Sequence, residues 1–227
     1  MNRDERCAIW LYGSLARGDA DRSSDVDVLL ACNDSISDSE IRDLSGLGHE
    51  FLSISQYSWP EIKGMARYGS LFLHHLRAEG KPVFESRSCA GELSCVLNNL
   101  GPYLYARRDL EAFKATLCDV RQSIENGGTP VFELSVLGTV FRHSAILACY
   151  VLGSPCFGRS LPVSQAVQAW GLPEEFASEF DSLYSFRLSR ERKSGCASHV
   201  GLDEVLLWCE RLARFLSELE VRIHAHD

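Results

Sequence analysis

The chain has 227 residues, of which 45% are hydrophobic and 24% are charged, and its formal net charge is −8. This globular composition allows one large domain or two small ones, and the negative charge excludes a broadly basic nucleic-acid binder. The charged start and the short apolar run after it lack the features of a secretory signal peptide. The longest clean apolar run elsewhere, residues 145–152, is too short to cross a bilayer, so we expect a cytoplasmic protein without a membrane partner.

The nine cysteines are scattered, odd in number and never spaced as Cys-x-x-Cys. Most lie in apolar periodic stretches, where a free thiol behaves as a small hydrophobic side chain. A disulfide framework is typical of shorter secreted chains. The pattern therefore indicates a reducing cytosol, and it argues against a structural zinc site.

Strand and helix signals alternate in the first third of the chain. His74 and His75 are neighbours on one expected helix, so we predict that one side chain faces the core and the other faces solvent. The expected strands span residues 7–12, 25–32, 51–57 and a short edge strand at 82–85, and the expected helices span 35–47, 60–68 and 70–78.

Long helical patterns replace the strands after Ser86. They span residues 91–126 with a break at Pro102, then 130–152, 162–170, 174–190 and 202–224. In the last, apolar residues recur at helical spacing, which no strand can satisfy: Val205, Trp208, Leu212, Phe215, Leu219 and Ile223. The fold class is therefore α+β, with a small mixed-sheet domain at residues 1–88 and an all-helical bundle at 89–227.

The residues after the first strand carry groups suited to phosphate binding. Gly13 permits a sharp turn and a close approach of phosphate to the backbone. A helix opening from Leu15 would point its first N–H groups at an anion. Ser14 adds a hydroxyl donor, and Arg17, one turn later, offers a cation for phosphate or for a carboxylate.

Asp25 and Asp27 are two residues apart on the second expected strand, so both side chains leave the same face. Val26 and Val28 then face the core. Two carboxylates beside a phosphate cradle would repel each other unless a cation joins them, and Mg²⁺ binds carboxylate and phosphate oxygens together. The implied chemistry is metal-assisted attack of a hydroxyl on the α-phosphate of a nucleoside triphosphate.

This Gly-Ser-x₁₀-Asp-x-Asp segment, with Arg17 and Ser24, resembles the signature of the minimal nucleotidyltransferases of the DNA polymerase β superfamily. The likeness continues through Trp59-Pro-Glu-Ile62 and Glu79-Gly80 and covers roughly residues 7–85. It implies that Asp25 and Asp27 are the catalytic Mg²⁺ ligands. It also implies that Gly13, Ser14, Arg17 and Ser24 bind the nucleotide.

The sequence departs from this family at one position. A third carboxylate is common on the next strand, and the resembling register places Ser53 there. Glu50 lies three residues too early and would face the other side of a regular strand. Three alternatives follow: the bundle supplies a base, substrate and water complete the metal shell, or catalysis is weak or lost.

The segment from Leu183 to His199, followed by a long amphipathic helix, resembles the C-terminal part of HEPN domains, which often accompany such nucleotidyltransferases. Ribonucleases of that family carry Arg-x₄₋₆-His, and six residues separate Arg192 from His199. The arginine would hold a phosphate and the histidine would act as acid or base. The alternative is a basic loop between two helices, or a bundle like that of kanamycin nucleotidyltransferase, which forms an acceptor wall.

We therefore expect transfer of NMP, in the form of AMP from ATP, to a hydroxyl acceptor held between the domains. The acceptor is a protein, an RNA end or a small molecule such as an antibiotic, and a toxin–antitoxin or phage-defence setting fits the resemblance. The alternatives are a catalytically weak nucleotide-binding module and a HEPN-type ribonuclease. A homo-oligomer is compatible with the sequence.

Overall fold

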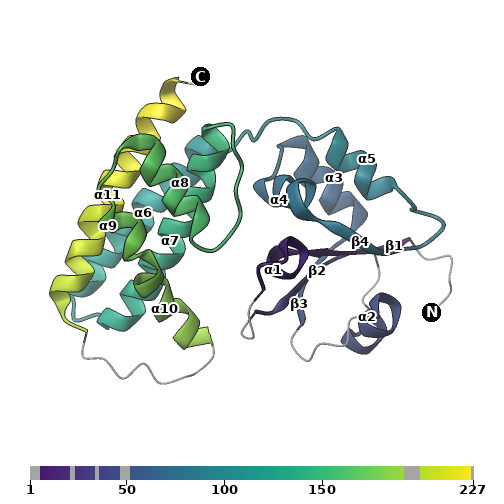
Figure 1. Ribbon diagram of the computed structural model, residues 1–227, viewed down its shortest axis with the longest axis horizontal. Coiled ribbons are helices and arrows are strands. Elements are labelled where there is room, and N and C mark those ends of the chain that lie inside the picture. The colour runs from purple at the N-terminus through teal and green to yellow at the C-terminus, as the bar shows by residue number, and fades with distance from the viewer. Residues whose placement is uncertain (1–5, 21–23, 34–35, 47–51, 192–199, 226–227) are drawn as a thin grey trace. The chain divides into compact units, whose positions relative to one another are not determined.

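The structure, a computed structural model, describes residues 6–20, 24–33, 36–46, 52–191 and 200–225. The chain divides into two compact units, Met1–Leu104 and Tyr105–Asp227. The first unit contains a four-stranded sheet and helices, and the described part of the second is entirely without strands (Figure 1). This confirms the predicted α+β class, a small mixed-sheet domain followed by a helical bundle.

The sheet of the first unit has the strand order β3-β2-β1-β4. β1 is antiparallel to β2 and β4, whereas β2 and β3 are parallel, so the sheet is mixed as predicted. Tyr12, the last residue of β1, is the Cα partner of Asp27 near the start of β2. The antiparallel pairing therefore brings the Gly-Ser turn beside the aspartates. The strands are β1 (Cys7–Tyr12), β2 (Val26–Cys32), β3 (Leu52–Tyr57) and β4 (Lys81–Glu85).

Helices cover both faces of this sheet. α3, α4 and α5 lie on one side and α2 lies on the other (Figure 1). Ser37 and Ser58 cap α2 and α3 with capping boxes completed by Glu40 and Glu61. The helices are α1 (Gly13–Arg17), α2 (Asp38–Ser45), α3 (Trp59–Arg67), α4 (Leu71–Glu79) and α5 (Glu92–Asn98).

The segment after β4 belongs to the first unit, not to the bundle. Cys89, Leu93, Leu97 and Leu100 are buried in the same apolar cluster as Trp59. The unit therefore ends at Leu104, whereas the sequence analysis placed the boundary between residues 88 and 89. The reason is that α5 buries its apolar face against α3, α4 and the sheet, which a helical pattern alone does not reveal.

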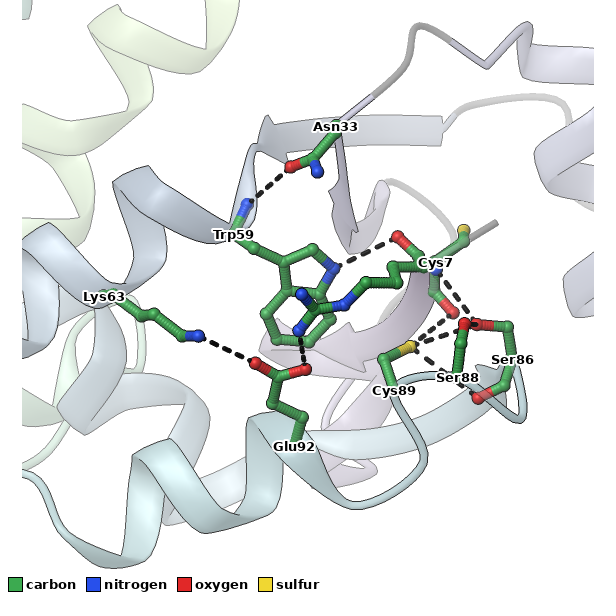
Figure 2. A network of polar contacts seen from close by, with 9 residues as sticks. Cys7, Asn33, Trp59, Lys63, Ser86, Ser88, Cys89 and Glu92 are labelled. Carbon is green, nitrogen blue, oxygen red and sulfur yellow. Dashed lines mark hydrogen bonds and ion pairs between the residues drawn. The ribbon is translucent and has the colours of Figure 1, made fainter. Parts of the chain in front are cut away.

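Polar contacts also tie this segment to the start of β1 (Figure 2). The backbone N–H of Cys7 donates to Ser86 Oγ at 3.2 Å, and the Cys89 thiol donates to the Cys7 carbonyl at 3.2 Å. Trp59 Nε1 donates to the carbonyl of Arg6 at 3.1 Å. These bonds satisfy buried polar groups where β1 begins, so the segment closes that end of the sheet.

In the second unit, α7 is the central helix and contacts α6, α8, α10 and α11. Two expected helices are each divided. A non-helical stretch containing Gly101-Pro102 separates α5 from α6, as the proline predicted, and a turn at Glu179 splits the expected helix 174–190. The helices are α6 (Ala106–Glu125), α7 (Pro130–Val151), α8 (Leu161–Trp170), α9 (Glu175–Ser178), α10 (Phe180–Glu191) and α11 (Leu202–Ala225).

Aromatic side chains fill the core of this bundle around Phe141 of α7, which is fully buried. Four ring centroids lie between 4.9 and 6.4 Å from its own, those of Phe176, Phe180, Trp208 and Phe215. All six apolar positions predicted to form one face of the last helix are buried. α7 is the one described helix long and apolar enough to span a membrane, but 67% of that window is buried, which is typical of a core helix.

Candidate active site

The turn after β1 leaves no room for a side chain. Gly13 has a φ of +75°, in the left-handed region that favours glycine. A Cβ built on it would overlap Oδ2 of Asp27 and lie 3.1 Å from its Cγ. Gly13 therefore lets the chain turn into α1 directly against the Asp27 carboxylate. A glycine is required here for lack of space as well as for the backbone conformation.

The two aspartates lie where the sequence placed them, although β2 begins one residue later than expected. Asp25 precedes the strand and is exposed, and Asp27 is its second residue and is half-buried. Val26 and Val28 are 3% and 0% exposed, as expected for residues that face the core. The alternation therefore presents the aspartates and the core valines to opposite faces.

The parallel pairing of β2 and β3 makes Ser53 the Cα partner of Asp27. Residues paired in this way point to the same face of a sheet, so Ser53 occupies the place beside Asp27 at which the sequence register puts it. Ser55, two residues on, exchanges a hydrogen bond of 2.9 Å with the hydroxyl of Tyr12. Glu50 lies outside the described residues.

Glu79, at the end of α4, links three groups around the turn. Its Oε1 accepts from the backbone N–H of Gly13 at 2.9 Å and from Arg17 Nη1 at 2.7 Å, and it also pairs with His75. Burial acts to raise the pKa of this carboxyl, but the bonds from His75 and Arg17 outweigh it and lower the pKa. Arg17, predicted to bind nucleotide, is thus engaged with Glu79 and also with Asp19.

His75 is part of this site, which the sequence did not predict. His74 is buried, as one of the pair was expected to be, but the His75 side chain is only 15% exposed and does not face solvent. Its ring packs edge-on against Tyr12, with centroids 5.4 Å apart. The available signal was the spacing of four between His75 and Glu79, which places both on one face of a helix.

Tyr12 joins the turn to the neighbouring strand. Its ring also meets Phe72 of α4 edge-on at a centroid distance of 5.4 Å. Burial raises the pKa of its hydroxyl, and the hydrogen bond to Ser55 acts in the opposite direction. The tyrosine is therefore held neutral, as a rigid part of the wall beside Asp27.

The remaining predicted residues are less informative. Ser14 is half-buried in α1, and Ser24, also half-buried, lies directly before Asp25. Arg192 and His199, the suggested ribonuclease pair, lie outside the described residues, so their spacing stays a sequence prediction.

Mg²⁺ fits the donor set of this site. In the described part of the chain, groups of three or more His, Cys, Asp or Glu able to hold a metal are absent. Asp25 and Asp27 nevertheless carry hard carboxylate oxygens beside the turn. Because Gly13 has no Cβ, the backbone of the turn can lie close to the Asp27 carboxylate. Because Mg²⁺ is usually held by one or two carboxylates together with substrate phosphates and water, two aspartates are sufficient.

Residues 1–87 match the family model described as "Polymerase beta, Nucleotidyltransferase". Residues 1–87 accordingly contain a nucleotidyltransferase domain of this type, which confirms the resemblance stated for residues 7–85. The sequence matches no curated protein. Among solved structures, the spectinomycin adenyltransferase AAD(9) from Enterococcus faecialis with ATP and spectinomycin aligns at 10% identity and a TM-score of 0.49, covering 94% of this chain and 92% of that chain.

Proposed function

We propose that this protein transfers a nucleoside monophosphate, AMP from ATP, to a hydroxyl acceptor. The observation that carries the proposal is the meeting of Gly13 and Asp27: the turn that would receive the triphosphate lies in van der Waals contact distance of a metal-binding carboxylate. In the reaction, the acceptor oxygen bonds to the α-phosphorus and the bond to pyrophosphate breaks.

The residues of the first unit divide this work. Asp25 and Asp27 would hold Mg²⁺, which supplies charge neutralisation and polarises the α-phosphate when bound. Ser14 would donate its hydroxyl to a phosphate oxygen, and the buried Tyr12 together with the half-buried Ser55 would give the site a fixed wall. Preorganised groups of this kind lower the reorganisation needed in the transition state.

The decisive experiment is calorimetric titration of Mg·ATP into the wild type and into Asp25→Asn with Asp27→Asn. We expect the double variant to lose Mg²⁺-dependent binding while its circular dichroism spectrum stays unchanged. Asp43→Asn with Asp203→Asn is the matched control, because it removes the same charge from two exposed helix positions. Unchanged Mg·ATP affinity in the double variant would refute the metal assignment.

The acceptor is tested by incubating the protein with each α-labelled nucleoside triphosphate and Mg²⁺. Cell lysate, RNA and aminoglycosides are offered separately, and transfer of label identifies both substrates. We expect ATP to label one of these classes and the Asp25→Asn, Asp27→Asn variant to label none.

A second candidate is a nucleotide-binding module with little turnover, which the serine beside Asp27 favours. Lacking a third carboxylate, the site would bind Mg·ATP through two ligands without an aspartate to accept the hydroxyl proton. Tight Mg·ATP binding with no label transferred to any acceptor would support this candidate over the first.

A further inference from the structure

The backbone N–H of Gly13 is bonded within the protein. It donates to Glu79 Oε1 at 2.9 Å, and the same oxygen receives Arg17 Nη1 at 2.7 Å. The Glu79 side chain is 10% exposed and that of Arg17 is 24% exposed, so the shared carboxylate is largely shielded from water. Glu79 therefore fixes both ends of α1, a helix of five residues that could not hold its shape alone.

A second chain of contacts fixes Glu79 itself. His75, one turn earlier on α4, pairs with the carboxylate and packs edge-on against Tyr12. The hydroxyl of Tyr12 bonds to Ser55 of β3 at 2.9 Å. Glu79 is thus held from α4 and from the sheet, and it transmits that position to the turn that contacts Asp27.

We propose that Glu79 is a positioning residue of the nucleotide site and that Arg17 acts as its partner, not as a ligand of the triphosphate. The inference rests on the proposed function, since it assigns how that site is held in shape. It revises the role that sequence reasoning gave to Arg17. A phosphate ligand should be available to the substrate, whereas Arg17 is already engaged by Glu79 and Asp19.

A double-mutant cycle separates the two roles of Arg17. Calorimetry gives the Kd for Mg·ATP of the full chain as wild type, Arg17→Ala, Glu79→Ala and the double variant. Residues that act through one contact give strongly non-additive effects. We expect each single variant to raise the Kd about tenfold or more, the loss typical of a hydrogen bond to a charged group. The Kd of the double variant should not exceed that of the single variant that binds Mg·ATP less tightly.

Two further variants keep the result specific. Glu79→Gln retains an oxygen that can accept the Gly13 N–H, so we expect its Kd to lie between those of the wild type and Glu79→Ala. Glu92→Ala is the matched control, because Glu92 also receives two basic side chains in the same unit, from Arg6 and Lys63. Its Kd should equal that of the wild type.

The amide of Gly13 gives a readout that does not need nucleotide. Glycine-selective labelling of the full chain gives up to 17 amide signals. Hydrogen exchange at Gly13 should be at least about tenfold faster in Glu79→Ala than in Glu92→Ala, since an amide exchanges only when its bond opens.

The outcomes are distinct. If wild type shows no Mg·ATP binding, the proposed function fails, and unchanged Gly13 exchange in Glu79→Ala would then also overturn the positioning role. If Mg·ATP binds but the effects of Arg17→Ala and Glu79→Ala multiply, Arg17 contacts the triphosphate on its own account and the inference is wrong. A Kd for Glu79→Ala equal to that of Glu92→Ala would overturn it as well.

Discussion

At each end of β1, a glutamate from a helix receives two basic side chains. Before the strand, Glu92 of α5 pairs with Arg6 and with Lys63 Nζ, the latter at 3.0 Å (Figure 2). After the strand, Glu79 of α4 pairs with Arg17 and His75. The pairing chemistry is similar, but the surroundings differ.

Exposure and one extra bond separate the two clusters. The side chains of Arg6 and Lys63 are 43% and 52% exposed, whereas those of Arg17 and His75 are 24% and 15% exposed. Of the two glutamates, only Glu79 also accepts the N–H of Gly13, whose turn lies against the Asp27 carboxylate. Ion pairs at the first end hold a surface segment in place, while those at the second end would position the groups of the proposed nucleotide site.

Glycine substitutions sharpen this comparison with the largest expected effect. Gly13 and Gly91 both have a φ of +75°, one at each end of the strand, but a Cβ on Gly91 meets nothing within 4 Å. Alanine at either position should cost about 1 kcal/mol of stability because of the left-handed backbone, and Gly13→Ala should cost more than Gly91→Ala because its Cβ would overlap Asp27. Only Gly13→Ala should also weaken Mg·ATP binding, by about 10–100-fold, since it displaces a carboxylate that would hold the metal.

Urea unfolding and Mg·ATP calorimetry on both alanine variants test this difference. The expected pattern is a loss of stability in both variants, larger in Gly13→Ala, with a loss of affinity confined to Gly13→Ala. Equal nucleotide affinity in the two variants would mean that the contact of Gly13 with Asp27 has no part in binding.

A smaller effect is expected from adding a carboxylate beside Asp27, at the end of β1 where the proposed nucleotide site lies. Ser53→Asp would place a third acidic side chain beside Asp27, its Cα partner. Metal affinity rises with the charge of the ligand set, so Mg²⁺ should bind about tenfold more tightly. Ser55→Asp is the control: it pairs with Leu29 and would break the bond to Tyr12, so it should bring no gain in metal affinity.

Titration of Mg²⁺ without nucleotide measures both variants directly. If Ser55→Asp tightened Mg²⁺ binding more than Ser53→Asp, the ion would have to lie nearer to Ser55 than to Ser53, the Cα partner of Asp27.

The elements that carry a local pattern could be predicted from the sequence. The Gly-Ser turn and the pair of aspartates follow from short spacings, and the position of Ser53 follows from the register that the family resemblance implies. The buried face of α11 follows from apolar residues at helical intervals, because burial against any neighbour requires that stripe. These features depend little on which partner the element meets.

Features that depend on a particular long-range contact could not be predicted. Glu79 is 66 positions from Gly13 in the chain and looks like an ordinary acidic residue at the end of a helix. Nothing in the sequence around His75 indicates that the ring of Tyr12 packs against it and shields it from water. The packing of α5 is a further case: it has an apolar face, and only the contacts of Leu93 and Leu97 show that it packs with the sheet.

The smallest expected effect concerns acid stability at the two ends of β1. The pKa of Glu79 is lowered, as burial is outweighed by the bonds from His75 and Arg17. A carboxyl with a lowered pKa stabilises the fold above its ordinary value of 4.5, and that stability is lost as the pH falls through the folded pKa. We therefore expect the wild type to exceed Glu79→Gln in stability by at most about 1 kcal/mol at pH 5, and the difference to shrink below pH 4.5.

Salt distinguishes this contribution from that of Glu92, whose pKa is lowered chiefly by its bond from Arg6. Screening acts mainly on exposed charges. In about 0.5 M NaCl, the difference between wild type and Glu92→Gln should diminish more than the difference between wild type and Glu79→Gln. Urea unfolding, followed on glycine amide signals of the first unit so that the bundle does not contribute, measures both. Equal salt sensitivity of the two differences would show that the Glu79 cluster is as open to solvent as the Glu92 cluster. The two ends of β1 would then differ only in the bond that Glu79 accepts from the Gly13 N–H.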